Sequence, residues 1–266
     1  MFTAKEYAMP ENLDEAYQIL TAKKTNYILG GCAWLRLGSR RMNTAIDLSL
    51  CGLDFITETD TAIEIGAMTS YRSLETSPIL AKYFNGYVGK CISSIVGTQF
   101  RNTVTVGGSV FGRYGFSDLL PVLLALDTGV VLYKAGEVPL SDFMNMPYTE
   151  KDIIIKIVIR KNDAKMSYQH FRNSSTDFPV LNLALSRSEQ GCVLMVGARS
   201  GKAVIAKKTS EFLTGADWDD PNQLIAQAQT LLDEVSFSGN MRASADYRRH
   251  LSKILLKRAI LEVASC

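Results

Sequence analysis

The chain has 266 residues, of which 47% are hydrophobic and 21% charged, a composition typical of globular proteins with one large domain or two modest ones. Its 29 Lys and Arg residues nearly balance 27 Asp and Glu residues, so the net charge of +2 gives no broad positive field to attract nucleic acid. The apolar runs, such as "LLPVLLAL" at 119–126, are shorter than the roughly 20 residues of a membrane-spanning helix. We therefore expect no nucleic-acid partner and no membrane span. The N-terminus lacks a signal-peptide pattern, which predicts a cytoplasmic protein.

The first part of the chain alternates helical and strand patterns. "PENLDEAYQILTAKK" at 10–24 predicts an amphipathic helix with Asn12 as its N-cap. "NYILGG" at 26–31 predicts a strand that runs into a tight glycine loop. Turn residues in "TETDT" predict a hairpin between 54 and 68, and residues 71–96 are predicted to be mainly helical, with a break near Asn85 and Gly86.

The middle of the chain carries three further patterns. "DLLPVLLAL" at 118–126 predicts a buried helix, and "GVVLYKAGEVPLSDF" at 129–143 predicts a hairpin. "KDIIIKIVIRK" at 151–161 predicts a strand buried on both faces.

The last hundred residues predict a sheet followed by helices. Four short apolar segments separated by turn residues indicate an antiparallel sheet: "KMSYQHFRN", "VLNLALSR", "GCVLMVGA" and "GKAVIAKK". The tail segments 218–235 and 244–264 carry apolar residues at helical spacing, which predicts two amphipathic helices on that sheet. The change of pattern near 161–165 predicts a boundary between two regions.

Cysteine and histidine give no metal or catalytic signature. The chain has two histidines and five scattered cysteines without a C-x-x-C pair: Cys32, Cys51, Cys91, Cys192 and Cys266. We expect reduced thiols, no metal ligands and no catalytic side chain. If the protein is an enzyme, a bound cofactor is then expected to carry the chemistry.

Two glycine pairs follow apolar stretches, Gly30 with Gly31 and Gly107 with Gly108. Each pair either makes a tight turn or lets backbone N–H groups converge on a phosphate. Neither pair has the spacing of a P-loop or of the Rossmann G-x-G-x-x-G pattern, so a nucleotide would have to bind through another fold.

Polar residues flank the second pair. Thr105 and Ser109 carry hydroxyls that either donate to phosphate oxygens or bond their own backbone. Asp118 either caps the following helix or accepts hydrogen bonds from ligand hydroxyls. These residues alone leave both alternatives open.

The order of these motifs resembles the FAD-binding medium subunits of the molybdenum hydroxylases, the xanthine dehydrogenase and carbon monoxide dehydrogenase family. "LGGCAWL" is similar to the family's first glycine loop, A-G-G-[TH]-[SD]-L, and "RNTVTVGGS" at 101–109 to its second, R-N-x-A-T-I-G-G-[NS]. "SDLLPVLLAL", "KDIIIKIVIR" and "RASADYRRHLSKILLKRAI" match later family motifs, so the resemblance covers nearly the whole chain.

The resemblance implies an α+β fold in two domains. Residues 1–163 would form a two-part FAD-binding domain of the vanillyl-alcohol oxidase and MurB type, with subdomains at about 1–53 and 54–163. Residues 164–266 would form a C-terminal antiparallel sheet with packed helices.

The resemblance also implies a site for noncovalent FAD. The two glycine loops would surround the pyrophosphate with backbone N–H groups, and Asp118 would accept from cofactor hydroxyls. Apolar side chains at family positions would line the cofactor or belong to the core. Gln169 stands where some relatives have a lysine near the flavin. The implied cofactor-binding residues are Ile28, Leu29, Gly30, Gly31, Cys32, Ala33, Trp34, Ile95, Thr105, Gly107, Gly108, Ser109, Asp118, Ile154 and Gln169.

The function that the resemblance implies is that of an oxidoreductase subunit. It would take electrons from the [2Fe-2S] clusters of a partner subunit, beside a molybdenum-cofactor subunit, and pass them from FAD to NAD or another acceptor. Two alternatives remain open. They are a free-standing FAD oxidoreductase on the same fold, and a cofactor-free structural or assembly homologue that has lost FAD.

Overall fold

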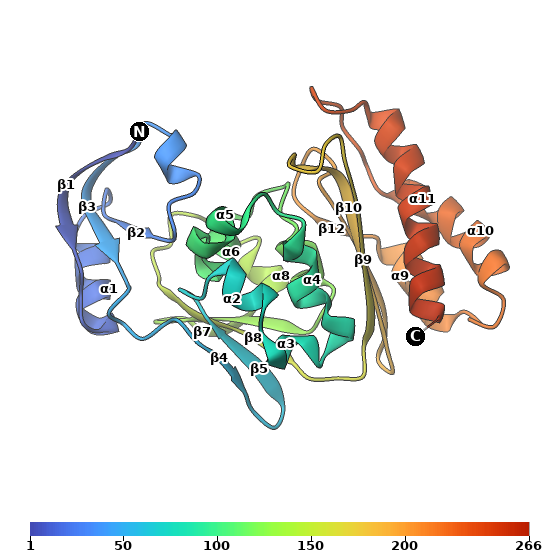
Figure 1. The fold of residues 1–266 in the computed structure, drawn as a ribbon, viewed down its shortest axis with the longest axis horizontal. Helices are drawn as coiled ribbons and strands as arrows, with labels where there is room; N and C mark the ends of the chain where they lie inside the picture. The colour runs from blue at the N-terminus through green and yellow to red at the C-terminus, as the bar shows by residue number, and fades with distance from the viewer. Residues whose placement is uncertain (266) are drawn as a thin grey trace. The chain divides into compact units, whose positions relative to one another are not determined.

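The computed structural model describes residues 1–265 and divides the chain into two compact units, each made of separate segments (Figure 1). The first unit comprises residues 1–76, 97–112 and 128–160. The second comprises residues 77–96 and 113–127 together with the described chain from 161 onward. Of the sheets formed by the described residues, two lie in the first unit and one lies in the second.

A small parallel sheet opens the first unit. Its strands are β1 (Thr3–Ala8), β3 (Arg41–Asp47) and β2 (Tyr27–Leu29), in the order β1-β3-β2. Helix α1 (Leu13–Ala22) packs against β3, and its predicted cap is confirmed because Asn12 Oδ1 accepts a hydrogen bond from the Glu15 amide at 2.9 Å. The short helix η1 (Leu35–Leu37) follows the loop after β2.

An antiparallel sheet of five strands forms the rest of the first unit's scaffold. Its order is β4-β5-β8-β6-β7, with bounds β4 (Ile56–Glu58), β5 (Ala62–Gly66), β8 (Ile154–Arg160), β6 (Thr128–Leu132) and β7 (Gly136–Pro139). The strand predicted to be buried on both faces is the central strand β8, in which Ile154, Ile157, Val158 and Ile159 are buried. The half-buried Lys156 interrupts its apolar residues and pairs with Glu64 of β5 at 2.6 Å. The short helices of this unit are α2 (Tyr71–Glu75), α5 (Thr98–Thr103), α6 (Val106–Gly112) and α8 (Leu140–Phe143).

The second unit contains the antiparallel sheet predicted for the C-terminal region. Its order is β12-β11-β10-β9, with bounds β12 (Val204–Ile205), β11 (Gly191–Gly197), β10 (Pro179–Ser188) and β9 (Lys165–Arg172). Helices α9 (Lys207–Gly215) and α11 (Ala245–Ala264) pack on one face of the sheet, and α10 (Pro221–Leu231) packs against both helices. The 3-10 turn η3 (Leu232–Glu234) follows α10.

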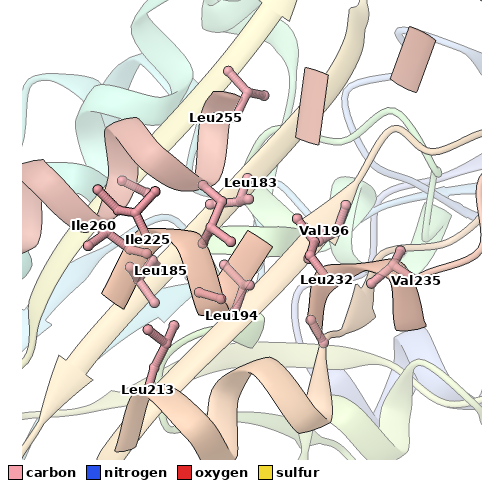
Figure 2. Packing of buried hydrophobic residues seen from close by; sticks show 14 of the residues in the cluster. Leu183, Leu185, Leu194, Val196, Leu213, Ile225, Leu232, Val235, Leu255 and Ile260 are labelled. Atoms are coloured by element: carbon pink, nitrogen blue, oxygen red, sulfur yellow. The ribbon is translucent and has the colours of Figure 1, made fainter. Parts of the chain in front are cut away.

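The core of the second unit lies between this sheet face and its helices (Figure 2). Alternate residues of β10 and β11 point into it, because successive side chains of a strand face opposite sides. Figure 2 labels Leu183, Leu185, Leu194 and Val196 from the strands, with Leu213, Ile225, Leu232, Val235, Leu255 and Ile260 from the helices and the η3 region.

Helices from the first half of the chain pack on the strand residues of this sheet whose side chains point away from that core. They are α3 (Pro78–Ala81), η2 (Phe84–Gly86), α4 (Tyr87–Ser93) and α7 (Leu119–Leu124), of which α4 packs on β9 and α7 on β10 and β11. The predicted break near Asn85 and Gly86 is confirmed, since both residues have positive φ angles of 54° and 73°.

The structure corrects the expectation in several places. Val106–Gly112 is a helix within the glycine segment, and Leu140–Phe143 turns into helix α8 after the predicted hairpin. Strands β1 and β3 and helix α9 were not predicted. The domain boundaries expected at 53 and 163 stay a prediction.

No helix in the part of the chain that the structure describes combines the length and the apolar character needed to cross a membrane. Within residues 1–265, no group of three His, Cys, Asp or Glu side chains is placed to hold a metal ion. The thiols of Cys32, Cys51, Cys91 and Cys192 are free, and Cys266 lies outside the described residues.

Candidate cofactor site

The first glycine loop leaves β2 with an open backbone. Gly31 and Cys32 both adopt left-handed conformations, with φ angles of 71° and 57°. Among the described residues, the amide N–H groups of Gly31, Cys32 and Ala33 find no acceptor. The loop is half-buried, so three consecutive N–H groups are available to an anionic ligand.

The two glycine pairs meet in the first unit. A Cβ atom at Gly30 would lie 2.8 Å from the Gly108 Cα atom, and one at Gly108 would lie 2.6 Å from the Gly30 carbonyl oxygen. A Cβ at Gly31 would overlap the Thr103 carbonyl oxygen. Glycine is thus required where the two loops approach each other, because any larger residue would force them apart.

The N–H groups of the second glycine loop donate to acceptors within the protein. Gly107 N donates to the Ala67 carbonyl oxygen at 2.8 Å, and Gly108 N donates to Thr105 Oγ1 at 3.1 Å. Ser109 donates its amide and its hydroxyl to the Thr105 carbonyl, at 3.1 and 2.9 Å. These N–H groups are thus bonded within the protein: Thr105, as the N-cap of α6, accepts from Gly108, and the Ala67 carbonyl accepts from Gly107. Of the two alternatives for the hydroxyls, the structure shows bonding to their own backbone.

The arginine of "RNTVTVGGS" holds the second loop in place. Arg101 is buried, and its Nε atom donates to Glu75 Oε2 at 2.8 Å while its Nη2 atom donates to Oε1 at 3.2 Å. This two-point ion pair joins α5 to α2. The neighbouring Asn102 is exposed.

Asp118 of the second unit is buried but does not cap α7. Its backbone is helical and its side chain makes no cap hydrogen bond, whereas Ser117 Oγ accepts from the Leu120 amide at 3.1 Å. Asp118 Oδ1 instead accepts from Tyr168 Oη and from Arg172 Nη2, each at 2.5 Å. Burial raises the pKa of this carboxyl to about 6, and the Arg172 charge opposes the rise.

Residues of β9 alternate between the two faces of the sheet. Tyr168 and Arg172 lie on the face of Asp118. Gln169 lies on the other face, where its Nε2 atom donates to Glu262 Oε2 of α11 at 2.8 Å. The structure therefore does not bring Gln169 together with Asp118. Sequence reasoning missed Tyr168 and Arg172, although strand alternation around Gln169 was available as a signal.

The apolar residues expected at the cofactor divide between the units. Ile28, Leu29 and Trp34 are half-buried in the first unit, beside the open loop. Ile154 is buried at the start of β8, a normal core position. Ile95 follows α4 in the second unit and is half-buried.

Comparison with known families matches nearly the whole chain. The family model described as "FAD binding domain in molybdopterin dehydrogenase" matches residues 2–160, and the model described as "CO dehydrogenase flavoprotein C-terminal domain" matches residues 166–263.

Individual relatives agree with this family match. The chain is 25% identical to the nicotine 6-hydroxylase medium subunit of Paenarthrobacter nicotinovorans, over 98% of each chain. It is 27% identical to aldehyde oxidase 4 of Rattus norvegicus, over 65% of this chain and 14% of that protein. Among solved structures, reconstituted CO dehydrogenase from Oligotropha carboxidovorans contains a chain with the same fold, with a TM-score of 0.88, 18% identity and coverage of 99% and 98%.

Proposed function

Because the chain belongs to the family of FAD binding domains in molybdopterin dehydrogenase, a family of FAD-binding oxidoreductases, we propose that it is the electron-transfer flavoprotein subunit of a molybdenum hydroxylase. It takes electrons from [2Fe-2S] clusters of a partner subunit and passes them to NAD or another acceptor. Bound FAD supplies the redox chemistry, while this chain binds the cofactor and orients it.

The open loop after β2 is the observation that carries this proposal. A pyrophosphate needs several convergent hydrogen-bond donors, and the N–H groups of Gly31, Cys32 and Ala33 are without acceptors among the described residues. The contact between Gly30 and Gly108 brings the Thr105 side chain beside this loop. The residues present therefore fit FAD, with the first loop as the donor set and the second as its support.

The other cofactor contacts in the proposal follow the family motifs. Ile28, Leu29 and Trp34 flank the open loop, and Thr105 to Ser109 form the support. The vanillyl-alcohol oxidase and MurB type of FAD domain and the boundary near residue 163 belong to the same proposal. Gln169 is not included, because its side chain is bonded to Glu262.

The partner subunits in the proposal follow from the extent of the match. The relative that the chain matches over 98% of each length is named a medium subunit, and the match to aldehyde oxidase 4 covers only 14% of that protein. We infer that the molybdenum cofactor and the iron-sulfur clusters reside on other chains.

The first experiment purifies the chain natively and records its visible spectrum before and after addition of FAD. We expect a flavin spectrum and saturable quenching of FAD fluorescence. A protein that is folded by circular dichroism but binds no FAD would overturn the proposal in favour of the cofactor-free homologue.

A second experiment separates a subunit from a free-standing enzyme. A tagged chain isolated from its native host is expected to copurify with molybdenum and iron in fixed ratio to FAD, measured by elemental analysis. Recovery of FAD without either metal would favour the free-standing oxidoreductase.

A substitution tests the placement of the pyrophosphate. Ala33→Asp puts a carboxylate into the open loop, and like-charge repulsion at a few ångströms is expected to weaken FAD binding on the order of tenfold or more. Leu37→Asp is the matched control, because Leu37 is 70% exposed in the adjacent turn η1. Equal FAD affinity of the two folded variants in a fluorescence titration would contradict the placement.

A further inference from the structure

Lys151 of the first unit donates all the N–H groups of its ammonium to backbone carbonyls. Its Nζ atom donates to the carbonyl oxygens of Leu20 at 2.9 Å, Lys23 at 2.6 Å and Asn26 at 3.1 Å. An ammonium group has three N–H donors, so these contacts use every one of them. Among the described residues, no carboxylate forms an ion pair with Lys151, and burial lowers the pKa of its ammonium group.

The three acceptors lie where helix α1 ends and strand β2 begins. Leu20 is in the last turn of α1, whose final carbonyls have no partner within the helix, and this turn contains no basic residue of its own. Lys23 is the C-cap residue and has an extended backbone. Asn26 directly precedes β2. Lys151 therefore supplies, from a distant part of the sequence, the donors that the turn between α1 and β2 lacks.

Strand β2 leads from this turn into the open loop. It has three residues and stands at the edge of the order β1-β3-β2, so β3 is its partner strand on one side. The open loop follows directly, with the free N–H groups of Gly31, Cys32 and Ala33. The position of these N–H groups thus depends on the ladder with β3 and on the contact of Lys151 with the residue before β2.

The five-stranded sheet holds the backbone on the other side of this contact. The carboxylate of Asp152, the residue after Lys151, accepts hydrogen bonds from two amides in the turn between β6 and β7. The donors are Lys134, at 3.1 Å, and Ala135, at 3.0 Å. The Lys151 side chain therefore reaches the α1–β2 turn from a backbone segment that is fixed to the sheet.

The second glycine loop is tied to the same sheet. The Ala67 amide donates to the Ile155 carbonyl oxygen of β8 at 2.9 Å, and the Ala67 carbonyl accepts from the Gly107 amide at 2.8 Å. The two glycine loops are thus both connected to the five-stranded sheet, the first through Lys151 and the second through Ala67. Loss of the Lys151 contact would leave the first loop without this connection.

We propose that Lys151 is a positioning residue for FAD. Its ammonium group fixes the start of β2 to the five-stranded sheet and so holds the N–H groups of the open loop in the geometry that binds the pyrophosphate. Lys151 acts through β2 and not by contact with the cofactor. The proposal rests on the proposed function and adds to it a residue outside both glycine loops.

The test compares the dissociation constants of FAD for the wild-type protein and Lys151→Met in a fluorescence titration. Methionine retains most of the length of the side chain but has neither the charge nor the donors. We expect FAD affinity to fall on the order of tenfold, because charged hydrogen bonds no longer hold the loop in its binding geometry.

Lys156→Met is the matched control. Lys156 is a half-buried lysine of β8 in the same unit, and its ammonium group pairs with Glu64 at 2.6 Å. This variant should bind FAD like the wild type. If Lys151→Met binds FAD as tightly as the wild type, or if both variants lose affinity equally, the positioning role is refuted. A wild-type protein without FAD affinity would instead refute the proposed function.

Hydrogen exchange distinguishes positioning from a general loss of stability. In folded Lys151→Met we expect faster amide exchange at the end of α1 and in β2, and weaker protection of residues 31–33 by FAD. The rest of the first unit should exchange as in the wild type. Reduced FAD affinity with unchanged exchange over residues 20–33, or with faster exchange throughout the first unit, would overturn the proposal.

A second variant keeps the proposal testable if Lys151→Met does not fold. The side chain of Lys151→Gln is one bond shorter and carries two N–H donors and no charge, so it can serve at most two of the three carbonyls. We expect its FAD affinity to lie severalfold below that of the wild type. Wild-type affinity of folded Lys151→Gln would show that the three contacts are not needed and would overturn the proposal.

Discussion

At the scale of single residues, the glycines of "TVTVGGSVFGRYGFSD" serve contacts within the protein. A Cβ atom at Gly107 would lie 2.8 Å from the Ala67 Cβ, and one at Gly115 would lie 2.5 Å from the Gly201 carbonyl oxygen. Gly108 has the same constraint against Gly30. In the proposed placement the ligand faces the first loop, and Gly107 and Gly108 let the second loop pack against Ala67 and Gly30.

Gly108→Ala tests this division. The added Cβ meets the Gly30 carbonyl at 2.6 Å and Thr105 Oγ1 at 3.0 Å, and backbone atoms cannot move away cheaply. We expect a loss of about 1–3 kcal/mol in the free energy of unfolding, together with weaker FAD binding. Gly215→Ala is the control, because nothing lies within 4 Å of its added Cβ. Equal stability of both variants in urea unfolding would show that the loops can separate without cost.

At the scale of elements, helix α11 is tied to the sheet by one buried arginine. Ser244 caps the helix by accepting from the Tyr247 amide, and Arg248 in the first turns is 1% exposed. The guanidinium donates to four acceptors on two other segments: the Val180 carbonyl of β10, and in the loop before α11 the carbonyls of Ser238 and Ala243 and Asn240 Oδ1. The "RASADYRR" motif therefore fixes the start of α11 to strand β10 and to the loop before the helix.

Arg248→Gln is expected to destabilise the protein by about 3 kcal/mol or more, because it leaves several buried carbonyls without donors. The adjacent Arg249→Gln is a matched control, since among the described residues Arg249 forms an ion pair only with the exposed Asp246. Arg249→Gln should lower the free energy of unfolding by less than about 1 kcal/mol. Urea denaturation of the two variants measures the difference, and similar midpoints would contradict the role of Arg248.

Local signals decide which elements can be predicted from the sequence. Helices α1 and α11 carry periodic apolar residues and a capping side chain, so their patterns predict them. Helix α6 contains three glycines, which disfavour helix, and it forms because Thr105 caps it and tertiary contacts require the glycines. Strand β1 has almost no buried side chains and therefore no apolar alternation to detect.

In the candidate site, too, some features follow from local sequence and others depend on the fold. The first glycine loop can be predicted from the sequence, because a strand followed by a Gly-Gly pair is a local pattern. The pairing of Asp118 with Arg172 joins residues 54 positions apart, and only the fold brings them together. The position of Gln169 likewise depends on the fold, because strand alternation places its side chain on the face opposite Asp118, where it donates to Glu262.

At the scale of the whole molecule, the question is how the chain retains its cofactor. Covalent attachment requires a nucleophilic side chain at the flavin, and the sequence has no histidine before residue 170. His170 lies in the second unit, with its Nδ1 atom buried. Cys32 lies in the open loop, but burial and then the Asp47 charge raise the pKa of its thiol, which keeps it protonated and unreactive. Retention must then come from the hydrogen bonds and packing of the site.

We therefore expect acid precipitation of the FAD-loaded protein to release all of its flavin. The supernatant should carry the flavin spectrum, and the mass of the denatured chain should equal that calculated from its sequence. Cys32→Ser should release its flavin in the same way, because the thiol forms no bond to the cofactor. Flavin that stays with the wild-type precipitate but not with Cys32→Ser would identify Cys32 as an attachment point and contradict noncovalent binding.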